Sequence, residues 1–218
     1  MFFKKIYKLN TIITSYYGTK TFINLFEQFK DLNRVVYNKS DQLLNLPNTQ
    51  EVKIPNVGRE TYTYLKHIID NYADLPEYTI FTQDDCHNHV PNNQQFRSVY
   101  DDVVENNRHF ALYNSTLRAG RPQRKTRVVT NGCVGLHTLG SHDAVKLYAD
   151  HLELKLPHRY VTNTCAFFIC SKQSILQNPL QFYEEALQLY LSDHIHPKHT
   201  KGYAFELMWQ IIFGEQDT

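Results

Sequence analysis

Two adjacent carboxylates directly follow a short segment of β-forming residues. Asp84 and Asp85 come after residues 78–82, which read YTIFT. In an open parallel sheet, ligands bind beyond the carboxyl ends of the strands, and carboxylate oxygens there suit Mg²⁺ or Mn²⁺. The pair therefore predicts a contact with a metal ion or with the group that the ion binds. The alternative is a solvated acidic turn that caps the next helix.

Histidines gather in two polar segments, one directly after the acidic pair and one near residue 196. They are His87, His89, His194, His196 and His199. Together with the acidic pair, such side chains can form the zinc or manganese centre of a hydrolase or nuclease. For any single histidine, the competing interpretation is a surface residue in a polar loop.

Arg59 and Glu60 stand in the first turn of a predicted helix. The amino end of a helix attracts anions, so Arg59 there can contact a phosphate. The alternative is a structural Arg–Glu pair that joins the helix to a neighbouring loop.

Basic residues also gather in a segment that contains Gly120 and Pro122: Arg118, Arg121, Arg124, Lys125 and Arg127. Such a segment can close over an anionic ligand as a lid, or bind an acidic partner. It can equally be a solvated loop, which is the usual role of a basic run.

Glu206 lies on a helix expected over residues 203–213. Apolar side chains cover almost the whole circumference of this helix, and only Glu206 and Gln210 share a polar stripe, so we expect the helix to be buried. A buried carboxylate must be paired or face a polar cleft, and burial raises its pKa toward the range of a general base. The alternative is a structural glutamate bonded to backbone amides or to an arginine such as Arg59.

The elements that must position these groups alternate between strand and helix. We predict strands at residues 11–14, 34–37, 52–54 and 78–82, and helices at 21–30 and 62–72. This order predicts one α/β domain over residues 1–218, with a mostly parallel central sheet flanked by helices.

The second half of the chain has a less regular pattern. We predict a helix at 92–107, a strand at 128–129 and a buried strand within 160–171. Asn178 is expected to cap a helix whose first residue is Pro179.

Composition excludes several classes of function. The net charge of only +1 over 218 residues does not indicate the strongly basic surface that nucleic-acid-binding proteins present. No segment approaches the roughly 20 apolar residues of a membrane span. The four cysteines form no CxxC pair, so we read them as reduced and expect a cytoplasmic protein without a nucleic-acid partner. The oligomeric state is left open.

Several blocks of the chain resemble an uncharacterised domain family that occurs in fungi, bacteria and large DNA viruses. The most specific block is IPNVGRE at 54–60, followed by TYL at 63–65, IIDNY at 68–72, LP at 75–76 and TIFTQ at 79–83. Outer blocks are VYNK at 36–39, AFFI at 166–169 and the final helix. The chain departs from the family where it has YYGT at 16–19 in place of an acidic YNE-type segment, and where DDCH at 84–87 follows the block.

The resemblance implies a glycosyltransferase of the nucleotide-sugar-binding α/β type called GT-A, which moves a sugar from a nucleotide-sugar donor to a saccharide acceptor. The acidic pair then resembles the Asp-x-Asp motif of that fold in its location. The residues expected to contact the donor are Arg59, Asp84, Asp85, Lys125 and Arg127.

The same resemblance implies a Mn²⁺ or Mg²⁺ ion on Asp85 and His199, with His196 as the alternative histidine, and Glu206 as the catalytic base. Two other functions remain open at this point. One is a metal-dependent hydrolase that uses the His and Asp clusters, and the other is a carbohydrate-binding module without catalysis.

Overall fold

A computed structural model describes residues 10–86, 92–113, 127–130, 133–134, 139–162, 166–192 and 198–214. Within these ranges, side chains are not described at 127–130, 133–134, 139–143, 159–162 and 198–201. None of the helices in the described ranges is both long enough and apolar enough to cross a membrane.

The first half of the chain contains β1 (Thr11–Tyr16), α1 (Phe22–Gln28), β2 (Asn33–Asn38), β3 (Gln50–Lys53), α2 (Arg59–Asn71), the short 3₁₀ helix η1 (Tyr72–Asp74), β4 (Tyr78–Gln83), α4 (Asn93–Glu105) and β5 (Phe110–Leu112). The second half contains β6 (Arg127–Thr130), β7 (Cys133–Val134), α5 (Leu139–His151), β8 (Arg159–Thr162), β9 (Phe168–Ser171), α6 (Lys172–Ile175), α7 (Leu180–Leu191) and α8 (Lys198–Phe213).

Six strands form the central sheet, in the order β3-β2-β1-β4-β9-β5. β1 pairs in parallel with β2 and with β4, so that Ile13 lies opposite both Val35 and Phe81. β9 runs antiparallel to its neighbours β4 and β5. The chain leaves β1 on one side, builds β2 and β3, and returns on the other side as β4. The predicted α/β class with a mostly parallel sheet flanked by helices is confirmed.

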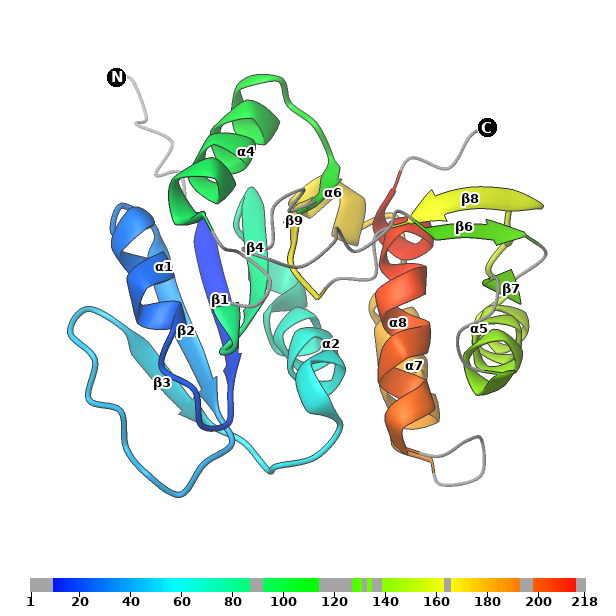
Figure 1. Cartoon of the computed structure of the whole chain (residues 1–218), viewed down its shortest axis with the longest axis horizontal. Helices are drawn as coiled ribbons and strands as arrows, with labels where there is room; N and C mark the ends of the chain where they lie inside the picture. The colour runs from blue at the N-terminus through cyan, green and yellow to red at the C-terminus, as the bar shows by residue number, and fades with distance from the viewer. Residues whose placement is uncertain are drawn as a thin grey trace.

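Helices cover both faces of this sheet (Figure 1), and alternating side chains divide the core between the two faces. Ile13, Phe81 and Phe168 lie in the cluster that includes α2, α7 and α8. Their neighbours Ile12 and Ile80 lie in the cluster that includes α1 and α4. Burial on both sides explains why the inner strands read as nearly continuous apolar runs. It also fixes their register, since a shift by one residue would exchange the two faces.

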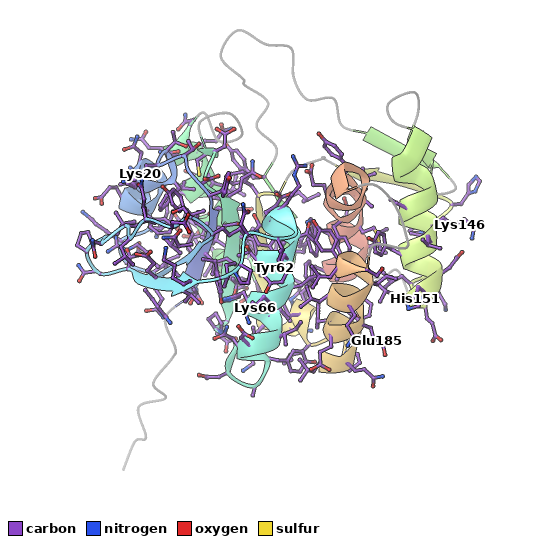
Figure 2. The ribbon with its side chains drawn as sticks, turned by 90° about the horizontal axis from the view of Figure 1, so that it is seen from below. Lys20, Tyr62, Lys66, Lys146, His151 and Glu185 are labelled. Atoms are coloured by element: carbon purple, nitrogen blue, oxygen red, sulfur yellow. The ribbon has the colours of Figure 1, made fainter. Side chains whose placement is uncertain are left out.

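A second, antiparallel sheet has the strand order β7-β6-β8. It lies beside α5, which packs against α8. Figure 2 shows the helices side by side, with Tyr62 on α2, Glu185 on α7 and His151 on α5. Sequence patterns predicted β6 at residues 128–129 but neither α5 nor a separate sheet.

Three boundaries differ from expectation. The buried strand predicted within 160–171 is β9, but the sequence did not predict β8, which precedes it and belongs to the other sheet. Asn178 does not cap α7, because Pro179 is itself the N-cap residue; the Asn178 Nδ2 instead donates to the Ile212 carbonyl at 3.1 Å. α8 begins at Lys198 rather than near residue 203.

Candidate functional site

A pocket of about 410 Å³ lies at the carboxyl ends of β1, β2 and β4, next to the amino end of α2. Its lining includes Ser15, Lys39, Arg59, Glu60, Gln83 and Asp84, and we call it the carboxyl-edge pocket. β1 and β4 meet here at the point where the strand order reverses. In open α/β sheets that point is where ligands bind.

Asp84 holds the loop that follows β1. Its Oδ2 accepts hydrogen bonds from the backbone N–H groups of Tyr17, Gly18 and Thr19, at 2.9, 2.9 and 3.0 Å. The Thr21 hydroxyl donates to the Asp84 carbonyl at 2.7 Å, which joins the same two loops again. Asp84 is therefore neither a solvated turn residue nor a carboxylate with both oxygens available, because one oxygen already binds three amides of its own chain.

Lys39 supplies a buried cation to the pocket. It follows β2, and only 7% of its surface is exposed. Its Nζ donates to the carbonyl of Val57 at 3.0 Å and to the carbonyl of Arg59. Burial lowers the pKa of the Lys39 ammonium to about 8, although the nearby charges of Glu60 and Asp84 oppose that shift.

Sequence reasoning missed Lys39 as a functional residue and quoted it only within the VYNK block. The available signal was its place directly after an apolar strand, at the edge where Asp84 was expected. The same rule of ligand binding at carboxyl ends applies to both residues.

The backbone is left-handed at the start of α2. The φ angle is +59° at Gly58 and +43° at Arg59. A Cβ at position 58 would lie 2.7 Å from the Tyr190 Cε1 and from the Tyr62 Cβ, so only glycine fits. A left-handed Arg59 costs roughly 1–2 kcal/mol; its carbonyl accepts from Lys39, and the Tyr190 hydroxyl donates to the Gly58 carbonyl at 2.9 Å. Strain of this kind clusters at ligand sites.

Arg59 connects the pocket with α8. A Cβ at Gly202 would lie 3.3 Å from the Arg59 Cδ, so the missing side chain at 202 leaves room for the arginine. The guanidinium carbon lies 5.8 Å from the ring centroid of Tyr203. Within the described part of the chain, Arg59 and Glu60 form no ion pair. Arg59 thus lines the pocket, and its contact with an anion stays a prediction.

Glu206 is 8% exposed on α8, as the sequence predicted. Its neighbours Phe205 and Leu207 belong to the core cluster on the α2 face of the sheet. Glu206 is not among the residues that line the carboxyl-edge pocket. It lies one turn after Gly202, the residue that contacts Arg59, and its role as a base stays a prediction.

The predicted metal ligands are only partly within the described structure. Asp85 is half-buried beside Asp84. His199 belongs to the first turn of α8, but its side chain is outside the described residues. Carboxylate oxygens at this position suit Mg²⁺ or Mn²⁺. However, no three His, Cys, Asp or Glu side chains converge for a metal ion within the described ranges.

The remaining predicted site residues also fall largely outside those ranges. Arg127 begins β6, without a described side chain. The others that lie outside are Lys125, Arg118, Arg121, Arg124, His87, His89, His194 and His196. The metal site, the basic lid and the two donor contacts at 125 and 127 therefore stay predictions.

Comparison with known proteins gives a family without an assigned activity. A family model with the description "Protein of unknown function (DUF3431)" matches residues 18–218. A search of curated proteins found no match to the chain. The resemblance to an uncharacterised family is confirmed, and the case for a function must come from the site.

Proposed function

We propose that this chain, which belongs to the family described as "Protein of unknown function (DUF3431)", is a glycosyltransferase that binds a nucleotide-sugar donor in the carboxyl-edge pocket and transfers the sugar to a saccharide acceptor. One observation supports this most strongly. The pocket lies at the ends of the neighbouring strands β1 and β4, where the strand order of the sheet reverses. It brings the cationic side chains of Lys39 and Arg59 to the amino end of the long helix α2.

The donor diphosphate is the part of the ligand that this pocket suits best. Helix amino ends carry a partial positive charge and stabilise phosphates. Lys39 and Arg59 add two full charges at the start of α2. Charge that develops on the leaving diphosphate during transfer would be stabilised by the same groups. A divalent cation on Asp85 and His199 would supply further neutralisation, and Lys125 and Arg127 would add positive charge from a second segment.

Glu206 is the proposed base. Its carboxylate would accept the proton of an acceptor hydroxyl while that oxygen bonds to the anomeric carbon of the sugar. The bond from that carbon to the diphosphate breaks, and the electron pair leaves with the diphosphate. The burial of Glu206 on α8, where it is 8% exposed, is the observation behind this role.

Donor binding is tested by calorimetry with UDP-, GDP- and dTDP-sugars, with and without Mn²⁺. We expect one nucleotide class to bind, and Asp84→Asn to weaken that binding at least about tenfold. The reason is that the backbone N–H groups of the loop at 17–19 would lose the negatively charged oxygen to which they donate hydrogen bonds. Asp102→Asn is the matched control, since Asp102 is an exposed carboxylate on α4. Unchanged affinity in Asp84→Asn, or saccharide binding without nucleotide binding, contradicts the proposal.

The base is tested with Glu206→Gln, which keeps shape and hydrogen bonding but cannot accept the proton. We expect transfer to fall about 10²-fold or more, the scale of general-base catalysis, while donor affinity stays at the parental value. Glu185→Gln, at a half-buried position of α7 where the carboxylate accepts from Gln181, is the control. Transfer at the parental rate in a folded Glu206→Gln protein would make Glu206 structural.

A further inference from the structure

We propose that Lys39 is the direct phosphoryl contact of the carboxyl-edge pocket, and that its ammonium binds a non-bridging oxygen of a diphosphate. This rests on the proposed function only for the kind of ligand, an organic diphosphate. The inference assigns the recognition of the anion to a residue that neither the sequence motifs nor the family description identifies.

The hydrogen bonds of Lys39 leave its charge without a direct counter-ion. An ammonium has three protons, and two of them go to the neutral carbonyls of Val57 and Arg59. No carboxylate forms an ion pair with Lys39 within the described ranges. A buried charge is costly unless it is paired, so a ligand anion in the pocket would supply the partner that the described residues do not.

The surroundings of Lys39 are mixed in charge. α2 contributes Glu60, the Arg59 guanidinium and the ring of Tyr62, whose centroid lies 5.6 Å from the Lys39 Nζ. The loop after β4 contributes Asp84. Glu60 and Asp84 favour the ammonium, but burial outweighs them and lowers the Lys39 pKa to about 8. A bound anion favours the charged form, so binding near pH 8 is expected to take up a proton.

Lys53 is a matched control within the same region. Its Nζ also donates to two carbonyls, those of Ser40 at 2.5 Å and Gln42 at 3.1 Å. It is exposed on β3 and does not line the pocket. Comparing the two lysine variants therefore separates the effect of losing hydrogen bonds to carbonyls from the effect of losing an ammonium group that lines the pocket.

The experiment is calorimetric titration of inorganic pyrophosphate into the full chain and into Lys39→Met, Lys39→Arg and Lys53→Met. Affinity is measured at pH 7 and pH 9, and at pH 8 in buffers of different ionisation enthalpy to count protons. We expect Lys39→Met to bind at least about tenfold more weakly and Lys53→Met to bind like the parent. The parent should lose affinity from pH 7 to 9 and take up a fraction of a proton at pH 8. Lys39→Met should keep only the part of both effects that comes from the titration of pyrophosphate itself.

A purely structural role for Lys39 predicts a different result. The Met variant would then bind more weakly, but it would keep the parental pH profile and proton uptake, and this outcome overturns the inference. Parental affinity in a folded Lys39→Met protein overturns it as well.

Two further measurements keep the test decisive. If Lys39→Met does not fold, the Lys39 ¹³Cε resonance of the parent is followed against pH. Its midpoint should move upward when pyrophosphate is added, and a constant midpoint overturns the inference. If pyrophosphate binds through Lys39 but no nucleotide sugar binds or reacts, the glycosyltransferase proposal fails while this inference stands.

Discussion

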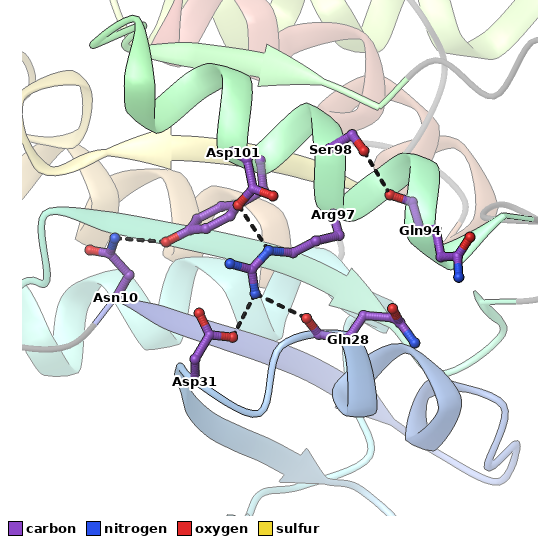
Figure 3. A network of polar contacts seen from close by, with 8 residues as sticks. Asn10, Gln28, Asp31, Gln94, Arg97, Ser98 and Asp101 are labelled. Carbon is purple, nitrogen blue, oxygen red and sulfur yellow. Dashed lines mark hydrogen bonds and ion pairs between the residues drawn. The ribbon is translucent and has the colours of Figure 1, made fainter.

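At the amino end of the central sheet, Arg97 of α4 lies between two carboxylates (Figure 3). Its Nη1 donates to the Asp31 Oδ1 at 2.5 Å, and its Nε donates to the Asp101 Oδ1 at 2.8 Å. At the carboxyl end, the Lys39 Nζ donates to the carbonyls of Val57 and Arg59 and forms no ion pair with a carboxylate in the described part of the chain. The bond to Asp31 raises the pKa of Arg97, whereas burial lowers that of Lys39. Arg97 is thus neutralised by carboxylates of its own chain, whereas we propose that the partner of Lys39 is a ligand anion.

The pockets at the two ends repeat this contrast. The amino-end pocket is larger, at about 620 Å³. Some of its polar groups bond one another: the Asn10 Nδ2 donates to the Tyr100 hydroxyl at 2.7 Å, and the Tyr78 N–H donates to the Asn10 Oδ1 at 3.0 Å. Size alone therefore does not decide between the two pockets. The carboxyl-edge pocket differs in having a buried cation whose hydrogen-bond partners, within the described residues, are neutral carbonyls.

The largest expected effect tests whether the carboxyl-edge pocket depends on the left-handed start of α2. Gly58→Ala places a Cβ 2.7 Å from Tyr190 and Tyr62 at a positive φ, so we expect the free energy of unfolding to fall by about 2–4 kcal/mol. Gly18→Ala is the control, because a Cβ there has no neighbour within 4 Å. Its effect should stay within about 0.5 kcal/mol. Urea unfolding measures both, and equal effects would contradict the prediction.

The next prediction distinguishes Arg97, which we expect to stabilise the fold, from Lys39, which we expect to bind the ligand. Arg97→Met removes the link between α4 and α1 and the cation over the rings of Phe29 and Tyr100. We expect a loss of about 1–2 kcal/mol in stability, with pyrophosphate affinity within twofold of the parent. Thermal unfolding and calorimetry measure the two quantities. A clear loss of affinity in Arg97→Met would end the distinction between a structural and a ligand-binding cation.

The last prediction concerns the pH dependence of stability. The Lys39 pKa is about 8 in the folded protein and about 10.4 in an unfolded chain. Between these values the unfolded state binds more protons, so this group makes stability rise with pH, by at most about 1.4 kcal/mol per pH unit. The difference in unfolding free energy between the parent and Lys39→Met should therefore change from pH 8 to pH 10. A difference that is constant over this window contradicts the prediction.

Local patterns in the sequence were sufficient to place Asp84 at the carboxyl edge of the sheet, but they did not show how it is held there. Asp84 was predicted at the carboxyl end of β4, where it lies, because an apolar strand followed by acids is a local signal. Its three amide partners, at 17–19, belong to a loop that is distant in the sequence, so a local pattern cannot predict them. Lys39 is buried beside the left-handed start of α2, where it donates to the Arg59 carbonyl, and this neighbour 20 residues away is not visible in a local pattern.

The errors in the second half have a similar origin. Residues 160–171 form one β-prone run, yet β8 and β9 pair with strands in different sheets. Strand pairing is a long-range property that periodicity does not contain. In α5 the buried residues Ala144, Val145, Tyr148 and Ala149 include two small ones, so the apolar stripe was too weak to predict a helix.

The amides that bind Asp84 lie 65 to 67 residues earlier in the chain. Closing a loop of that length costs entropy before any bond is formed, and the bonds become possible only after β4 has paired with β1. The loop at 17–19 should therefore reach its final conformation late in folding. The rate of amide hydrogen exchange at Tyr17, Gly18 and Thr19 would then report whether β1 and β4 are paired. Slow exchange at these three amides would indicate that the pocket is assembled.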